Sequence, residues 1–245
     1  MDVLISDLVN QPLLLVAPTI HEFNAIQYAV KDQLAGGRIE LSMSGMGMHA
    51  ITAFCRVLEG RSRPLSGLAL LGWAGGLSPD LQAGDVVIAS SAMNTRGGQQ
   101  PCKVIPLTGA TIGPVMTVPA PVITPQEKNA HRASGALAIE MEAYHLAAWA
   151  QARGLPFIHA RVVLDTVDES LPDLGNALDV YGRASPLQLT IRLLARPQLI
   201  GQLFHLYRKI RILAPSLGWL AGAVAQSWFE QYPLPDVREV TPTRG

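Results

Sequence analysis

Acidic residues follow two apolar segments in the second half of this 245-residue chain. The first segment, 138–143, reads Ala-Ile-Glu-Met-Glu-Ala, and the second, 161–165, reads Arg-Val-Val-Leu-Asp. An apolar stretch at helical spacing separates them. The pattern therefore places carboxylates at two successive strand ends. This arrangement suits a site in which one carboxylate accepts hydrogen bonds from a sugar diol and another acid protonates a leaving base.

Apolar strands and helices alternate along the chain and must position these acids. Buried strands are predicted at 13–17, 38–44, 68–71, 84–89 and 156–164, and helices at 49–59 and 142–153. The alternation predicts an α/β fold: a single three-layer domain with a mixed, mostly parallel central sheet flanked by helices, plus a C-terminal helical extension. Ligands of such sheets bind beyond the carboxyl ends of the strands. Here those ends carry 18–22, 45–47, 72–76, 140–142 and Asp165.

The composition excludes several functional classes. The chain is 49% hydrophobic and 16% charged, which is typical of a protein with a sizeable core. Nineteen basic residues balance nineteen acidic ones, so no nucleic-acid partner is expected. Cys55 and Cys102 match no metal or redox spacing, and no HExxH motif occurs, so neither a metal nor a cofactor is expected. Asp2 and Asp7 argue against a secretory signal, and a cytoplasmic protein is expected.

The C-terminal part differs in character from the rest. We predict an α/β core over 1–170, a helical part over 171–232 packed on the core or on a partner, and a tail over 233–245. The helices are expected to break near Pro197 and Pro215.

No Asp or Glu occurs between Asp179 and Glu230, whereas several arginines do. Two interpretations stay open for 180–229. The helices pack on the domain or on a second subunit, or they form a basic, apolar surface that contacts the inner face of a membrane peripherally.

Four blocks of sequence resemble the purine nucleoside phosphorylase and methylthioadenosine/S-adenosylhomocysteine nucleosidase superfamily. They are 16–26, the Ser-Gly-Met-Gly of 44–47, the glycine-rich 72–87, and 139–143 together with 161–165. The resemblance spans roughly residues 13–168 and implies cleavage of a purine nucleoside at its N-glycosidic bond by a homodimer or larger homo-oligomer. Leu171-Pro172 and 194–199 resemble the hopanoid-associated branch, which is linked to removal of adenine from adenosylhopane.

The resemblance implies catalytic roles for three residues. Asp165 would be the general acid that protonates the purine. Glu22 would orient an attacking water, and Arg161 would lie near the nucleophile. Each residue has an ordinary structural alternative. Asp165 could cap a turn, Glu22 could be the acid of a helix N-terminus, and Arg161 could form a salt bridge.

The same resemblance implies a set of substrate-binding residues. Glu142 would accept hydrogen bonds from the ribose hydroxyls, and Met141 would pack against the ribose. Glycine loops at 45–47 and 72–76 would bring backbone amides close to substrate. Glu140 alternates with Glu142 and is expected to face elsewhere. The substrate-binding set is Gly45, Gly47, Trp73, Ala74, Gly75, Met141 and Glu142.

The segment Thr19-Ile-His-Glu22 has an acid and no arginine, which favours water over a phosphate dianion as nucleophile. Phosphate is a co-substrate only in the alternative, a phosphorylase. Trp73 and Leu164 depart from the family pattern, which has small or hydroxyl residues there. These two departures argue against methylthioadenosine or S-adenosylhomocysteine as the substrate. They also motivate an alternative of another class, a non-catalytic nucleoside- or lipid-binding protein.

Overall fold

A mixed sheet of eight strands lies at the centre of residues 11–232, the part of the chain that the computed structural model describes. The strand order is β2-β1-β3-β7-β6-β4-β5, and β8 pairs with β3 and β4. Most neighbouring strands are parallel, whereas β7 on β3, and β5 and β8 on β4, are antiparallel. The strands are β1 (Leu13–Ala17), β2 (Ile39–Met43), β3 (Gly67–Gly76), β4 (Val86–Asn94), β5 (Gln99–Pro101), β6 (Thr111–Thr117), β7 (Ala138–Glu140) and β8 (Phe157–Asp165).

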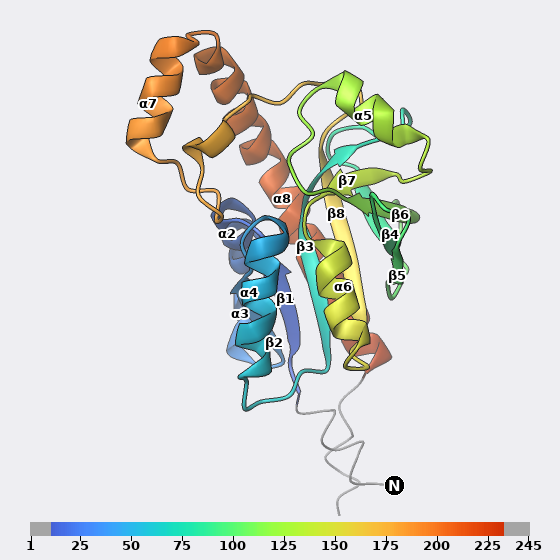
Figure 1. Cartoon of the computed structure of the whole chain (residues 1–245). Coiled ribbons are helices and arrows are strands. Elements are labelled where there is room, and N and C mark those ends of the chain that lie inside the picture. Colours follow the sequence, from blue (N-terminus) through green and yellow to red (C-terminus); the bar gives the residue numbers. More distant parts are fainter. Residues whose placement is uncertain (1–10, 233–245) are drawn as a thin grey trace, which may run out of the picture.

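Helices cover both faces of this sheet, because successive side chains of its strands point to opposite sides. Leu13 and Leu15 of β1 pack with α2 and α8, whereas Leu14 and Val16 pack with α4 and α6. Figure 1 shows α4 and α6 in front of the sheet and α8 behind it. The predicted three-layer α/β domain is therefore confirmed. The helices are α2 (Ile20–Ala29), α3 (Lys31–Ala35), α4 (Gly47–Glu59), α5 (Pro125–Arg132), α6 (Ala143–Gln151), α7 (Pro186–Ala195) and α8 (Leu199–Gln231), with a short 3₁₀ turn at Gly175–Ala177.

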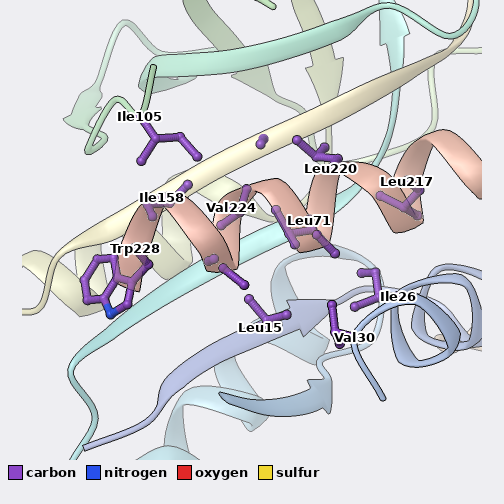
Figure 2. Close-up of a cluster of buried hydrophobic side chains, with 14 of the residues drawn as sticks. Leu15, Ile26, Val30, Leu71, Ile105, Ile158, Leu217, Leu220, Val224 and Trp228 are labelled. Atoms are coloured by element: carbon purple, nitrogen blue, oxygen red, sulfur yellow. The ribbon is translucent and has the colours of Figure 1, made fainter. Parts of the chain in front are cut away.

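The second half of α8 belongs to the core. Leu217, Leu220, Val224 and Trp228 are buried against the strands and α2, as Figure 2 shows. The predicted break near Pro197 is confirmed, because α7 ends at Ala195 and α8 begins at Leu199.

The predicted break near Pro215 is wrong, because α8 continues through this proline. Leu213 and Leu217 on either side are buried, and their packing offsets the one hydrogen bond that proline removes. The domain boundary near residue 170 stays a prediction. The predicted tail, 233–245, lies outside the described residues.

The glycine-rich segment 72–76 is not a loop, contrary to the sequence prediction. It is the last part of β3, where Gly72 pairs with Arg161, Trp73 with Val162 and Ala74 with Val163 of β8. The parallel partner strand thus holds this segment extended. Two strands consequently end side by side, and both deliver polar groups to the same edge of the sheet.

A hairpin of α7 and the first half of α8 stands beside the end of the sheet at which β1, β3 and β8 terminate (Figure 1). α7 has no buried residue, and α8 has none between Leu199 and Leu213. Over residues 11–232, no helix combines the length and the apolarity that crossing a bilayer requires.

Candidate active site

A cavity of about 210 Å³ lies at the carboxyl ends of β1, β3 and β8, beside β7. Every predicted site residue except the two loop glycines lines it: Glu22, Trp73, Ala74, Gly75, Met141, Glu142, Arg161 and Asp165. Apolar side chains complete the wall: Pro18, Met46, Val118, Pro121, Val122, Ile139, Leu164 and Leu171. The chain therefore brings three predicted acids, Glu22, Glu142 and Asp165, to one hollow.

Gly45 and Gly47 do not line the cavity, whereas Met46 between them does. Both glycines have positive φ, 81° and 80°, in the left-handed region that other residues rarely adopt. The turn directs the Gly47 N–H to Glu142 Oε1, at 2.9 Å. These glycines thus position a side chain of the site.

Arg161 is the buried cation around which the carboxylates gather. Its Nη2 donates to Glu140 Oε2 at 2.6 Å and to Glu142 Oε2 at 3.1 Å. Its Nε donates to His159 Nε2 at 2.8 Å, and its Nη1 donates to the carbonyl of Trp73 at 3.3 Å. Burial lowers the pKa of His159 to about 3, and Arg161 acts in the same direction, so His159 is a neutral acceptor. The arginine donors are therefore directed at protein acceptors.

Glu140 lines the cavity, and the expectation that it faces elsewhere is wrong. Alternation between Glu140 and Glu142 fails because β7 ends at Glu140 and Glu142 already caps α6. Glu140 Oε2 accepts hydrogen bonds from the backbone N–H groups of Glu142 and Ala143, each at 2.9 Å. Thr117 Oγ1 donates a hydrogen bond to Glu140 Oε1. Burial opposes its ionisation, but Arg161 holds the pKa of Glu140 below its usual range. Glu140 is thus the carboxylate that anchors Arg161.

Glu142 shares Arg161 with Glu140 and is 4% exposed. Burial raises its pKa to about 8, and the negative charge of Glu140 adds to this effect. Its two oxygens lie between the Gly47 amide and the arginine. A carboxyl group in this position accepts hydroxyl donors from a ligand, and these donors would favour its ionised form.

Glu22 is the acid of a helix N-terminus, as in the structural alternative stated above, and it also lines the cavity. Its Oε2 accepts from the Thr19 N–H at 2.8 Å and from Thr19 Oγ1 at 2.6 Å, as in a capping box. Its Oε1 accepts from the Trp73 N–H at 2.7 Å and lies 3.9 Å from Arg161 Nη1. Burial raises the pKa of Glu22, against the lowering effect of Arg161. The carboxyl group is therefore held in one fixed orientation at the cavity wall.

Asp165 ends β8 and forms an ion pair with Lys128 of α5 that the sequence did not reveal. The Lys128 side chain is fully buried, and its Nζ also donates to the carbonyls of Thr166 at 2.6 Å and Glu169 at 2.7 Å. Burial raises the pKa of Asp165, while Lys128 opposes that rise. An aspartic acid with a raised pKa at a cavity wall is a candidate proton donor.

Gly72 shapes the site in a way that differs from the prediction, in which its backbone amide approached the substrate. A Cβ atom there would collide with Glu22 Oε1 and Arg161 Nη1. The absent side chain is therefore what allows Glu22 and Arg161 to approach each other across β3. A glycine at a strand end, between an acid and an arginine on adjacent elements, is the signal that could have identified it.

Two segments of the chain, 5–111 and 108–185, match the family model of the phosphorylase superfamily. The chain belongs to the phosphorylase superfamily. No curated protein matches it. Among solved structures, this superfamily member resembles a Helicobacter pylori 5′-methylthioadenosine/S-adenosylhomocysteine nucleosidase, with 14% identity, coverage of 90% of this chain and 99% of that chain, and a TM-score of 0.61.

Two further solved structures resemble this chain over a smaller part of its length. The Neisseria meningitidis 5′-methylthioadenosine/S-adenosylhomocysteine nucleosidase is 20% identical over 65% of this chain and 87% of that chain, with a TM-score of 0.54. A futalosine hydrolase mutant of Helicobacter pylori is 15% identical over 65% and 87%, with a TM-score of 0.53. These likenesses show the shared fold.

Proposed function

We propose that the protein hydrolyses the N-glycosidic bond of a purine nucleoside. The observation that carries this proposal is the convergence of Glu22, Glu142 and Asp165 on one cavity, with Glu22 and Glu142 beside the buried Arg161 and Asp165 paired with the buried Lys128. Cleavage of this bond needs a proton for the leaving base, an anchor for the sugar hydroxyls and a positioned nucleophile. Each acid meets one of these needs.

Asp165 would donate the proton to the purine as the bond breaks. Its raised pKa, caused by burial, retains the acid form to higher pH than for an exposed aspartate. Glu142 would accept hydrogen bonds from the ribose hydroxyls. The Met141 thioether is next to it in the cavity wall. The purine base leaves as a neutral molecule once it has been protonated.

Water is the proposed nucleophile, and Glu22 would orient it. The proton that the water loses as its oxygen bonds to the anomeric carbon would pass to solvent and would balance the proton that Asp165 gives to the base. A phosphate dianion would need free cationic donors, but Nη2 of Arg161 already binds Glu140 and Glu142. Glu140, whose pKa Arg161 holds below its usual range, is already an anion beside this guanidinium, so a second anion would be repelled at short range. The same argument disfavours the phosphorylase alternative.

The base in this proposal is adenine, and the 5′ substituent is long and apolar, as in adenosylhopane. One solved relative, from Colwellia psychrerythraea, holds adenine, and one from Helicobacter pylori holds 5′-methylthioadenosine in its active site. In this chain Val118, Val122 and Leu171 line the cavity and offer an apolar wall to such a substituent. The hopanoid assignment also rests on the resemblance at 171–172 and 194–199.

A homodimer or larger homo-oligomer is part of the proposal, as the resemblance implies. Light scattering on the purified full chain tests it, because the scattered intensity gives the mass of the assembly directly. A mass equal to that of one 26.3 kDa chain would contradict this part of the proposal without affecting the chemistry.

The reaction is tested by incubating the purified protein with adenosine and with a series of 5′-alkylated adenosines, and by following free adenine. We expect adenine release that improves as the 5′ group becomes longer and more apolar. Asp165→Asn serves as the inactive control. Nucleoside binding in calorimetry without adenine release would instead support the non-catalytic binding protein.

A further inference from the structure

The hairpin formed by α7 and residues 199–212 of α8 presents two apolar stripes to solvent. Leu187, Ile191 and Leu194 recur at i, i+4 and i+7 on α7, and Ile200, Phe204 and Tyr207 do the same on α8. All six side chains are between 55% and 79% exposed. Residues at this spacing lie on one face of a helix, so each helix has a continuous apolar face that the described chain leaves uncovered. Exposed apolar faces of this kind mark interaction surfaces.

The charge of the hairpin has one sign. Residues 180–229 contain no Asp or Glu and six basic residues: Arg183, Arg192, Arg196, Arg208, Lys209 and Arg211. Acids outside this tract pair with some of them, since Asp173 contacts Arg192 and Arg196, and Glu169 contacts Lys209. The remaining excess is cationic. Apolar helix faces flanked by arginine are the features that bind an anionic lipid surface.

The hairpin is fixed to the rim of the candidate active site. Before α7, the carbonyl of Val180 accepts from the Met46 N–H at 2.7 Å, and that of Tyr181 accepts from the Ile20 N–H at 3.0 Å. A cavity of about 330 Å³ beneath α8 includes His205 and Lys209. This second cavity shares Asp165 and Leu171 with the active-site cavity. Whatever covers the hairpin therefore lies close to the candidate active-site cavity.

From these observations we infer that the α7–α8 hairpin docks on the surface of an anionic membrane. The stripes enter the boundary between headgroups and acyl chains, and the arginines contact anionic headgroups. A second copy of the chain fits this face less well. A two-fold interface would place the same cationic patch against itself, which like charges oppose. The inference goes beyond the proposed reaction, because it concerns where the enzyme meets its substrate.

Flotation of the full chain with vesicles tests the inference. We expect binding to vesicles of phosphatidylcholine with about a third phosphatidylglycerol, little binding to phosphatidylcholine alone, and loss of binding at high salt. The double variants Ile191→Ser/Phe204→Ser and Arg208→Glu/Arg211→Glu should each weaken binding roughly tenfold or more. Val57→Ser is the matched control, because Val57 on α4 is as exposed as Phe204, at 69% each, and lies outside the hairpin.

Adenine release from a water-soluble nucleoside without vesicles is measured in parallel on the same variants. Unchanged release with lost flotation supports the inference, whereas absent release in the wild type concerns the proposed reaction alone. Equal flotation of wild type and both double variants, or no flotation, overturns the docking inference. A dimer that dissociates in the same variants also overturns it, because the face would then be covered by a second copy.

Discussion

The ammonium of Lys128 is in contact with Asp165 Oδ2 in a pair that is almost wholly withdrawn from solvent, with side-chain exposures of 0% and 3%. α5 thus delivers a buried cation to the carboxyl end of β8, where two backbone carbonyls hold it in place. The pair matters for chemistry because burial raises the pKa of Asp165 while Lys128 restrains that rise. Lys128 lies outside the cavity wall, so we regard it as a positioning residue.

Removing the charge of Lys128 should shift the pH profile of the reaction. A general acid is active while protonated, so the rate falls as pH rises through its pKa. Lys128→Met removes the group that lowers the pKa of Asp165 and should move this alkaline limb to higher pH. Lys128→Arg keeps the charge and should keep the limb near its wild-type position. Profiles of kcat/KM against pH measure this, and an unmoved limb in a folded Lys128→Met protein would contradict the role.

Asp165→Asn should lower kcat by about 10²- to 10⁴-fold, the usual contribution of a general acid. The fold should persist, because Lys128 retains the carbonyls of Thr166 and Glu169 as acceptors. Asp168→Asn is the control, since Asp168 is exposed and three residues further along the chain. Adenine release and thermal unfolding are measured together. Wild-type turnover by a folded Asp165→Asn protein would refute the assignment.

A methyl group at Gly72 should displace the Glu22 and Arg161 side chains of the site. Gly72→Ala forces a Cβ against Glu22 and Arg161, and such overpacking costs about 1–3 kcal/mol of unfolding free energy. It should also lower adenine release. Gly222→Ala is the matched control, because that helical glycine has no atom within 4 Å of an added Cβ. The control should stabilise the protein by up to about 1 kcal/mol. Urea unfolding distinguishes the two, and equal effects would argue against the close approach.

Glu142 should make the fold less stable as pH rises. Burial raises its pKa from 4.5 to about 8, so the folded state holds a proton that the unfolded state has released. The resulting stabilisation is complete below pH 4.5 and is lost as pH rises through about 8. In Glu142→Gln this part of the slope should vanish. The free energy of unfolding is measured as a function of pH across that range, with Asp168→Asn as the control. If this free energy depends on pH with the same slope in Glu142→Gln and in the wild type, the prediction is contradicted.

The sequence predicted the elements well because their signals are local. Apolar runs such as 13–17 and 68–71 are strands in a buried sheet, and the acids that follow strands lie at one edge of it. Glu140 was misplaced because alternation presumes that a strand continues. Here the chain turns after Glu140, and both glutamates reach Arg161. The end of a three-residue strand has no clear sequence signal.

Lys128 could not be found for a different reason. It lies on α5, a short helix whose sequence, Pro-Gln-Glu-Lys-Asn-Ala-His-Arg, has the polarity of an exposed segment. Only the fold places that helix over the end of β8 and buries the one lysine. Pro215 shows the same limit, because tertiary packing around Leu213 and Leu217 overrides the local tendency of proline to end a helix.

The central claim is that water, and not phosphate, attacks the sugar at a site built from Glu22, Glu142 and Asp165. The most direct measurement is the rate of adenine release at saturating nucleoside as phosphate is added to a phosphate-free buffer, with the sugar product identified. The account predicts a rate that phosphate leaves unchanged and a free sugar as product. A rate that is zero without phosphate and rises with it, together with a sugar 1-phosphate as product, would contradict the account.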